Sequence, residues 1–315
     1  MKSFTINNND AGQRLDKFLR KAAPQLPPSL LYRAIRQKNI KINKKRCAPS
    51  DKLAPGDVVS LYLPDDLLAP REHDFLAAPD TLEIVYEDEN ILLINKPQGL
   101  LVHEGDTPGP DTLILRVQRY LYQRGEWDPA RENSFTPALC NRIDRNTCGI
   151  VIAAKNFGAL QIISEKLRAR EITKLYLCIV HGVPKKKSGL LSGYLRRDET
   201  AKKVQIFHRQ TPGAKSALLK YQVIAEKGGK ALLEVQLLTG RTHQIRAQLA
   251  AAGHPIWGDA KYGDSRENKQ RGNRQALCAY KLVFSFTSSG QELDYLRGKS
   301  FEISTPFAEE FAWPK

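Results

Sequence analysis

A short charged loop runs directly into an apolar segment near the middle of this chain. Residues 141–149 read Asn-Arg-Ile-Asp-Arg-Asn-Thr-Cys-Gly, and residues 150–154 read Ile-Val-Ile-Ala-Ala. The apolar segment predicts a strand, and Asn146, Thr147 and Gly149 predict a turn before it. The fold must therefore hold a charged loop, with Asp144 at its centre, against the start of a strand.

Asp144 lies between Arg142 and Arg145 in the sequence, and nearby positive charge favours an ionised carboxylate. An ionised aspartate is the form that acts as a nucleophile. The structural alternative is a salt-bridged turn, because ion pairs without a catalytic role perturb carboxylates in the same way. The local sequence alone favours the salt-bridged turn, so evidence for a catalytic role has to come from other parts of the chain.

The length and composition are those of an ordinary globular protein with two domains, or with one large domain and an appended module. The chain has 315 residues, of which 41% are hydrophobic and 26% charged. No apolar run approaches the roughly 18 residues that span a bilayer, and the first ten residues do not resemble a secretory signal. We therefore expect no membrane segment and a cytoplasmic location.

Cysteine and histidine spacing does not predict a metal site. The five cysteines form no C-x-x-C pair, and the six histidines show no metal-ligand spacing such as H-E-x-x-H. Phosphate-loop and dinucleotide-binding patterns are also missing from the sequence. We expect neither a metal ion nor a cofactor.

Positive charge is the strongest compositional signal. The net charge is +15, and residues 1–60 hold 13 lysines and arginines against four acidic residues, a local net charge of +9. Basic surfaces attract polyanions through counterion release, so nucleic acid is the first candidate partner. An anionic membrane surface is the second, but no long basic amphipathic helix supports it.

Residues 1–63 are predicted to form a small α/β module. Leu15, Phe18 and Leu19 have helical spacing, a second helix is expected to begin with Ser29 as its cap, and residues 40–46 suggest a basic hairpin. This order of pieces resembles an S4 domain, a small RNA-binding module. The resemblance implies that RNA contacts Arg14, Lys17, Arg33, Arg36, Lys38, Lys41, Lys44, Lys45 and Arg46. The alternative for these side chains is a solvated basic face.

An acidic, proline-punctuated stretch at residues 64–80 is predicted to be a linker, and residues 81–315 to form a larger α+β domain. Its strand at residues 91–95 should be buried on both faces, and further strands favour a mixed, largely antiparallel sheet with flanking helices. A helix is expected to open in residues 241–246 and to present His243 and Arg246 on one face.

Four blocks in the larger domain carry a second resemblance. They are residues 96–100 (Lys-Pro-Gln-Gly-Leu), 142–147, 174–176 (Lys-Leu-Tyr) and 240–246 (Gly-Arg-Thr-His-Gln-Ile-Arg). In this order they resemble the RluA family of pseudouridine synthases, and the N-terminal module resembles that of the RluC or RluD type. Residues 253–259 and the pair Tyr262-Gly263 match another family block. The family signature H-R-L-D-x-x-T-S-G has Asn141 and Cys148 here in place of His and Ser, a departure that leaves the aspartate intact.

The resemblance assigns roles to four side chains. Asp144 matches the catalytic carboxylate, Arg246 its arginine partner, and Tyr176 the tyrosine that stacks on the target base. Arg142 matches the arginine that enters the RNA stack when the target nucleotide flips out. His243 has no required catalytic counterpart, and Lys96 is expected to shape the strand exit beside the cleft.

The sequence therefore predicts a monomeric pseudouridine synthase that modifies uridines in structured RNA, with large-subunit 23S ribosomal RNA as the favoured substrate. One alternative is a synthase acting on tRNA. The other is a non-catalytic RNA-binding or ribosome assembly factor, in which the basic module matters and Asp144 does not.

Overall fold

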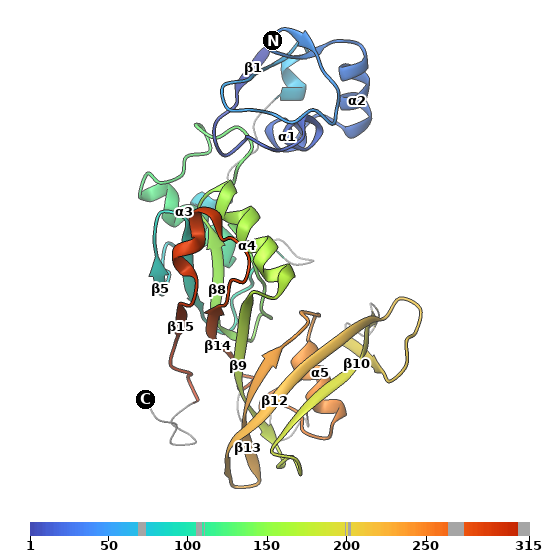
Figure 1. The fold of residues 1–315 in the computed structure, drawn as a ribbon, viewed down its shortest axis with the longest axis vertical. Helices are drawn as coiled ribbons and strands as arrows, with labels where there is room; N and C mark the ends of the chain where they lie inside the picture. Colours follow the sequence, from blue (N-terminus) through green and yellow to red (C-terminus); the bar gives the residue numbers. More distant parts are fainter. Residues whose placement is uncertain are drawn as a thin grey trace.

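A computed structural model describes residues 1–68, 74–104, 109, 111–198, 200, 203–263 and 274–307. The chain forms an N-terminal unit and a larger unit built on one long sheet (Figure 1). The N-terminal sheet has the order β1-β4-β2-β3 and is antiparallel. Its elements are β1 (Lys2–Thr5), α1 (Leu15–Ala22), α2 (Pro28–Arg36), β2 (Ile40–Ile42), β3 (Lys45–Arg46) and β4 (Val58–Leu61).

The larger unit contains an 11-stranded sheet with the order β11-β10-β12-β13-β9-β14-β8-β6-β5, to which β15 and β7 add at β14 and β8. The β14–β8 pair is parallel and the other pairs are antiparallel. The predicted mixed, largely antiparallel α+β fold is therefore confirmed. The strands are β5 (Ile84–Glu87), β6 (Ile91–Lys96), β7 (Ala138–Leu139), β8 (Cys148–Ala154), β9 (Ile172–His181), β10 (Ser188–Asp198), β11 (Lys203–Phe207), β12 (Lys215–Lys227), β13 (Lys230–Leu237), β14 (Leu277–Phe284) and β15 (Ser300–Glu302).

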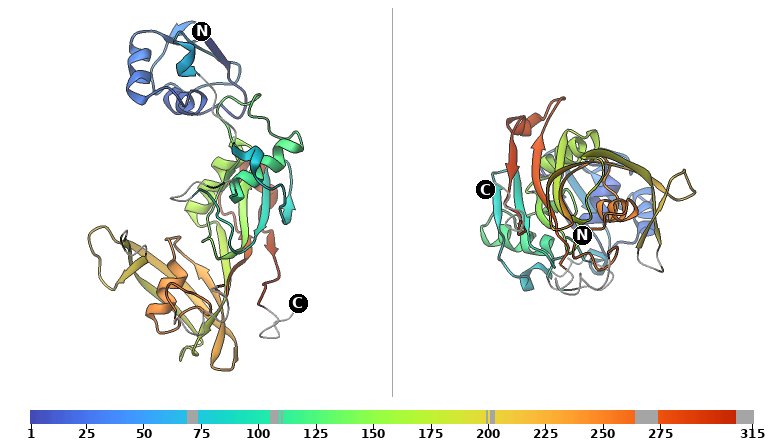
Figure 2. Two further views of the ribbon diagram at one scale, coloured as in Figure 1. Left: turned by 180° about the vertical axis from the view of Figure 1, so that it is seen from behind. Right: turned by 90° about the horizontal axis from the view of Figure 1, so that it is seen from below.

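Three α-helices and three short 3-10 helices complete the fold. The α-helices are α3 (Leu113–Gln123), α4 (Phe157–Ala169) and α5 (Gln244–Ala251). The 3-10 helices are η1 (Asp65–Leu68), η2 (Asp74–Ala77) and η3 (Gln291–Leu296). From behind, α5 lies over one face of the lower part of the sheet (Figure 2). No helix within the described ranges combines the length and the apolar character that crossing a bilayer requires.

Strand β6 has core on both of its faces, as the sequence predicted. Leu92 and Ile94 belong to the cluster that contains α3, whereas Ile91 and Leu93 belong to the cluster that contains α4. Alternate residues of a strand point to opposite faces, so one apolar run serves two cores. The neighbouring strand β8 is likewise buried along its whole length.

Strand β8 begins at a point of very close approach to β14. Gly149 has a φ angle of +119°, and a Cβ atom there would lie 2.3 Å from the carbonyl oxygen of Ala279. Only a residue without a side chain fits this conformation and this spacing. This close approach places the charged loop before β8 at the point where β8 and β14 pair in parallel.

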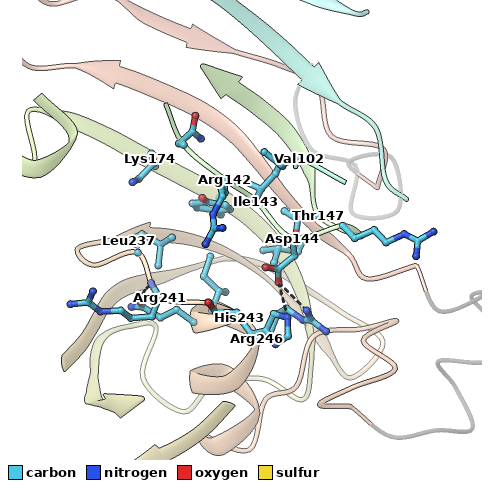
Figure 3. Close-up of a pocket in the computed structure, with 18 of the residues that line it drawn as sticks. Val102, Arg142, Ile143, Asp144, Thr147, Lys174, Leu237, Arg241, His243 and Arg246 are labelled. Atoms are coloured by element: carbon cyan, nitrogen blue, oxygen red, sulfur yellow. Dashed lines mark hydrogen bonds and ion pairs between the residues drawn. The ribbon is translucent and has the colours of Figure 1, made fainter. Parts of the chain in front are cut away.

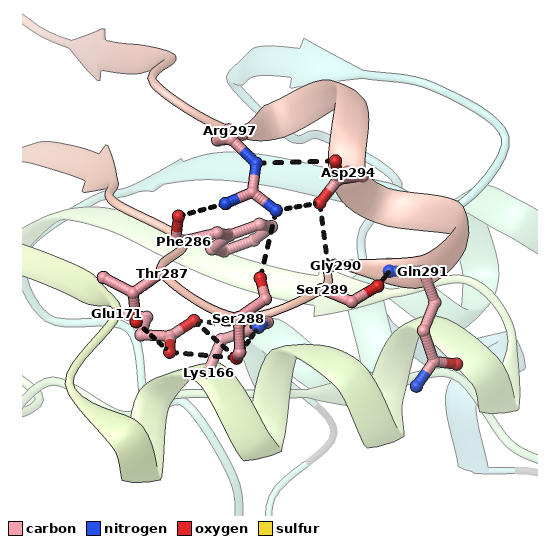
Figure 4. Close-up of polar contacts among 10 residues, drawn as sticks. All are labelled: Lys166, Glu171, Phe286, Thr287, Ser288, Ser289, Gly290, Gln291, Asp294 and Arg297. Atoms are coloured by element: carbon pink, nitrogen blue, oxygen red, sulfur yellow. Dashed lines mark hydrogen bonds and ion pairs between the residues drawn. The ribbon is translucent and has the colours of Figure 1, made fainter.

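A buried polar cluster fixes the connection from α4 to β9 (Figure 4). Lys166 donates to Glu171 at 2.8 Å, and Glu171 also accepts from the hydroxyls of Thr287 and Ser288. These contacts lower the pKa of Glu171 to about 2, with the Lys166 contact as the largest cause. A charge-assisted network of this kind holds the end of α4 against the loop that precedes η3.

The N-terminal unit meets the larger unit through a polar joint. The Ser134 hydroxyl donates to Asp10 at 2.6 Å and accepts from the Gln13 amide at 2.8 Å, and Asn133 donates to the other oxygen of Asp10. Asp10, Gln13 and Ser134 are all buried. None of the apolar core clusters formed by the described residues spans this joint.

Two local expectations need correction. The first residue of α2 is Pro28 and its cap is Pro27, which provides no side-chain hydrogen bond, so Ser29 is not the cap. Part of the stretch at 64–80 is ordered core, because Phe75 is buried and packs edge-on against Trp127 with ring centroids 5.2 Å apart. Residues 69–73 of that stretch lie outside the described residues.

Candidate active site

A pocket of about 520 Å³ lies between the central strands and the start of α5 (Figure 3). Its lining includes all four side chains that the sequence singled out in the larger unit, namely Arg142, Asp144, Tyr176 and Arg246. They come from the loop before β8, from β9 and from α5, so the fold brings together residues up to 104 positions apart in the sequence. A concave site with a few convergent polar groups is the expected form of a small-ligand or nucleotide pocket.

The loop that carries Asp144 is held by backbone contacts on both sides. The Thr147 amide donates to the Asp144 carbonyl at 3.0 Å and closes the predicted turn. The Asn141 side chain accepts a hydrogen bond from the Ile152 amide at 2.8 Å. Asn141, one of the two departures from the family signature, thus ties the loop to β8.

The side chain of Lys96 holds the same loop in place. Its ammonium group is fully buried and donates to three backbone carbonyls, those of Pro97 and Leu100 at 2.8 Å and of Arg145 at 3.0 Å. Burial lowers the pKa of Lys96 to about 8. All three ammonium hydrogens are engaged, so this lysine supports the loop and does not face the pocket.

Asp144 forms its ion pair with Arg246, at 2.9 Å between Oδ2 and Nη1. The expectation that Arg142 and Arg145 flank the carboxylate is wrong, because neither lies within ion-pair distance of it, and Arg145 donates to the Gly99 carbonyl instead. The neutralising charge therefore comes from α5, 102 residues away in the sequence. A guanidinium group that donates to a carboxylate holds it both ionised and oriented.

Arg246 is itself fixed by Asp259, whose role the sequence analysis missed. Asp259 is 1% exposed and accepts from Arg246 Nε at 2.7 Å and from Nη2 at 2.9 Å. Burial raises the pKa of Asp259, but the Arg246 guanidinium outweighs this effect and the net pKa is lowered. The available signal was the block at 253–263, in which Asp259 follows a glycine and precedes Tyr262 by three residues.

His243 lies beside the ion pair and is neutral. Its Nε2 atom is 3.9 Å from Asp144 Oδ2, and its Nδ1 atom is 3.0 Å from the Tyr262 hydroxyl. Burial lowers the pKa of His243 to about 4, and this effect outweighs the opposing influence of Asp144. The expected shared helical face with Arg246 is wrong in detail, because α5 begins at Gln244 and His243 is its cap, with a φ angle of +52°.

Tyr176 and Arg142 line the pocket with opposite exposure. Tyr176 is 5% exposed, and burial together with the Asp144 charge raises the pKa of its phenol, so the hydroxyl stays protonated at neutral pH. Arg142 is exposed. The same pocket is therefore lined by a buried aromatic ring and an exposed cation.

The predicted RNA-binding side chains of the N-terminal unit do not reach this pocket. They lie on α1, α2 and the β2–β3 hairpin, in the unit drawn at the top of Figure 1. Lys41 is half-buried and the other eight are exposed. Arg14 pairs with Asp16 at 3.0 Å, whereas the rest have no ion-pair partner among the described residues. Their charge is thus available to an external anion.

Within the part of the chain that the structure describes, no three His, Cys, Asp or Glu side chains gather in a way that could hold a metal ion.

Comparison with known proteins identifies both units. Residues 90–251 match the family model described as RNA pseudouridylate synthase, and residues 13–59 match the S4 domain. The first match spans the Asp144 loop, Tyr176 and all of α5. The second spans α1, α2 and the basic hairpin, so the predicted S4 domain is confirmed.

Relatives of the whole chain carry related descriptions. The ribosomal large subunit pseudouridine synthase C of Vibrio vulnificus (strain CMCP6) is 32% identical over 314 residues, covering 97% of this chain and 92% of that protein. The protein of the same name from Escherichia coli (strain K12) is 32% identical over 308 residues, covering 92% and 91%. The solved structure of human RNA Pseudouridylate Synthase Domain Containing 1 matches the fold with a TM-score of 0.56 at 23% identity, covering 74% of this chain and 87% of that one.

Proposed function

The chain belongs to the RNA pseudouridylate synthase family, and on that premise we propose that it converts uridines of large-subunit ribosomal RNA into pseudouridine with Asp144 as its catalytic carboxylate. The enzyme is an isomerase that acts on RNA. The observation that carries the residue assignment is the Asp144–Arg246 ion pair at 2.9 Å inside the pocket.

The reaction breaks the bond between C1′ of the ribose and N1 of uracil, turns the base, and joins C5 to C1′. C5 then loses its hydrogen as a proton and N1 gains a proton, so the product is an isomer of uridine. Departure of the base leaves positive charge on the sugar, and the ionised Asp144 stabilises that charge or bonds to the sugar directly. Arg246 holds this carboxylate in position inside the pocket, and Asp259 keeps Arg246 in place.

Tyr176 and Arg142 are assigned to the handling of the base. The protonated, buried ring of Tyr176 stacks on the target uracil, since bases that leave a helix are commonly held against aromatic side chains. The exposed Arg142 enters the RNA stack in place of the flipped nucleotide. Flipping costs a few kcal/mol, and a planar cation that fills the gap offsets part of this cost.

Ribosomal RNA is favoured because the full-length relatives are described as ribosomal large subunit enzymes. We assign residues 1–63 to RNA binding, 81–315 to catalysis and 64–80 to their connection. The exposed cations of α2 and the β2–β3 hairpin are proposed to bind phosphates of the same RNA. A monomeric state and a cytoplasmic location remain predictions from the sequence.

The test is to map pseudouridines in ribosomal RNA and tRNA from cells that express wild type or Asp144→Asn in place of the chromosomal copy. Specific large-subunit sites should lose pseudouridine with Asp144→Asn, because the amide is nearly isosteric but is not a nucleophilic anion. Asp128→Asn, which alters an aspartate that pairs with the exposed Arg131 and does not line the pocket, is the matched control and should keep full modification.

Two results would contradict the proposal. Unchanged pseudouridine in the Asp144→Asn strain would remove the carboxylate from its role. If pseudouridine were lost only from tRNA, Asp144 would keep its catalytic role, but the substrate would be tRNA and not ribosomal RNA.

A further inference from the structure

A second pocket opens beside the active-site pocket and is continuous with it. It has a volume of about 450 Å³ and lies between the end of α4, the start of β9 and the segment that follows β13. The two pockets share five lining residues, namely Leu167, Lys174, Leu237, Gly240 and Arg241. Figure 3 shows Lys174 and Arg241 at the side of the first pocket away from Asp144 and Thr147. The shared wall therefore leads away from the reacting carboxylate.

The lining of the second pocket is cationic. Arg168, Arg170, Lys174 and Arg241 all contribute to it, and none of its described lining residues is an aspartate or a glutamate. The first pocket, in contrast, contains both Asp144 and Glu104. A groove with one sign of charge concentrates ligands of the opposite sign.

The four cations are not neutralised within the protein. None has a carboxylate within ion-pair distance among the described residues; the Nε atoms of Arg168 and Arg241 donate only to the carbonyls of Ser164 and Ser216. Arg168, Arg170 and Arg241 are exposed, and Lys174 is half-buried. Burial lowers the pKa of Lys174, and a bound anion would reverse this effect.

The backbone that carries two of these cations is held in place. Arg170 is the C-terminal cap of α4 with a φ angle of +62°, and the buried Lys166–Glu171 pair flanks it on both sides (Figure 4). Thr287 and Ser288 bind the same Glu171 carboxylate. Arg168 and Arg170 are therefore presented from a fixed connection, which reduces the ordering cost of binding.

We propose that this cationic groove, formed by Arg168, Arg170, Lys174 and Arg241, binds the phosphate backbone of the RNA strand next to the target nucleotide. The inference rests on the proposed function. A flipped nucleotide stays attached to its neighbours through two phosphates, so a strand must leave the active-site pocket along its surface. The groove provides an exit that starts at the shared wall and carries the charge that a phosphate backbone requires.

The experiment compares two variants of the full chain that each lose two positive charges. Arg168→Gln/Arg170→Gln alters the groove. Lys185→Gln/Lys186→Gln alters two exposed lysines in the loop after β9, beyond the opposite end of that strand from Lys174, and neither lysine lines the groove. Glutamine retains a long polar side chain in both cases, and a thermal unfolding scan checks that both variants fold.

Binding of a synthetic stem-loop RNA with uridines in its loop is measured over a salt series, together with turnover. For the arginine pair, the slope of log K against log salt should flatten by about 0.7 to 0.9 per lost phosphate contact. KM should rise while kcat at saturating RNA stays within about twofold, because these residues do not touch the reacting atoms. The lysine pair should match wild type in both measurements.

Equal slopes for the two variants would overturn the proposal, because net charge alone would then account for the effect. Binding of poly-glutamate with the same dependence on the arginine pair would overturn the assignment to RNA. Failure of the proposed function gives a different result: wild type would form no pseudouridine in the stem-loop or in ribosomal RNA, while the salt slope would still report on the groove.

Discussion

Arg246 and Asp259 form a buried two-point contact that leaves one guanidinium nitrogen for Asp144. Arg246 Nε and Nη2 donate to the two oxygens of Asp259 at 2.7 and 2.9 Å, and Nη1 donates to Asp144 at 2.9 Å. Asp259 also accepts from the backbone amides of Lys261 and Tyr262. The buried Asp259 therefore fixes the orientation in which Arg246 donates to Asp144.

Asp259→Asn should lower kcat about 10- to 100-fold while RNA affinity changes little. The amide offers one acceptor oxygen in place of two, and loss of a charge-assisted hydrogen bond of about 1.5–3 kcal/mol weakens the hold on Arg246. Steady-state kinetics check this, with Asp128→Asn as the control for an aspartate away from the pocket. Arg246→Lys should be comparably severe, since lysine cannot contact Asp259 and Asp144 together through a planar fork. Full activity of either variant would contradict the positioning role.

His243 should make stability fall in acid. Burial lowers its pKa from 6.5 to about 4 in the folded chain. Between these values the unfolded chain binds a proton that the folded chain excludes, so the stabilisation is complete above pH 6.5 and is lost as pH falls through 4. After allowance for solvent screening we expect about 1–2 kcal/mol.

Urea unfolding of wild type and His243→Gln between pH 4 and 7 checks this prediction. The advantage of wild type over the variant should shrink as the pH falls. A constant difference across the range would show that His243 does not titrate differently in the two states.

Tyr176→Phe and Tyr176→Leu should separate stacking from proton transfer. Phe keeps the aromatic face, and if the protonated hydroxyl passes a proton to the base, kcat should fall about 10²- to 10⁴-fold. Leu also removes the stacking surface and should raise KM in addition. Single-turnover rates and binding of a stem-loop RNA distinguish the two effects. Equal kcat for Phe and wild type would exclude the hydroxyl as a relay.

Lys96→Met should destabilise the chain by about 2–4 kcal/mol, because a thioether of similar length leaves buried carbonyls without their donor. The Asp144 loop should loosen, so kcat should fall while RNA affinity is retained. Chemical unfolding and kinetics provide the measurement. The control is Lys155→Met, which removes a half-buried lysine that pairs with Glu87 and Glu126 and donates to the Asp88 carbonyl, away from the Asp144 loop. Destabilisation without any change in kcat would mean that Lys96 supports the fold and not the loop.

Charge reversal at Arg33, Arg36 and Lys44 should weaken binding to large structured RNA and flatten its salt dependence by about 0.7 to 0.9 per lost phosphate contact. Turnover on a short, saturating stem-loop should be unchanged, because none of these side chains lines the pocket. Reversal at Lys185, Lys186 and Lys215, three other exposed lysines, tests whether total charge explains the effect. Equal losses of affinity from both sets would mean that the cations of the N-terminal module form only a solvated face and are not the RNA-binding surface.

Sequence patterns predicted the parts of this structure that depend on nearby residues. The run at 91–95 predicted a strand buried on both faces, and β6 has core on each side. The turn before β8 was also predicted, because a small number of consecutive residues determines it. Such features follow from local periodicity and turn chemistry.

The ion pairs were harder to predict because their partners are distant in sequence. Asp144 has two arginines within two positions of it, yet its partner is Arg246, since the backbone of the loop turns Arg145 toward Gly99. Asp259 lies in a short loop after α5, and its partner Arg246 is 13 residues away on that helix. The left-handed conformation of His243 likewise depends on how the chain enters α5. Tertiary structure determines all three.

The polar joint between the S4 domain and the larger unit has a consequence for how the two units behave when they are separated. Its contacts are hydrogen bonds among Asp10, Gln13, Asn133 and Ser134, and water satisfies such groups once the two parts separate. Separation of the two units therefore exposes no large apolar surface that would cause either unit to aggregate. Each unit keeps its own apolar core, so we expect the N-terminal unit and the larger unit each to fold when they are produced separately.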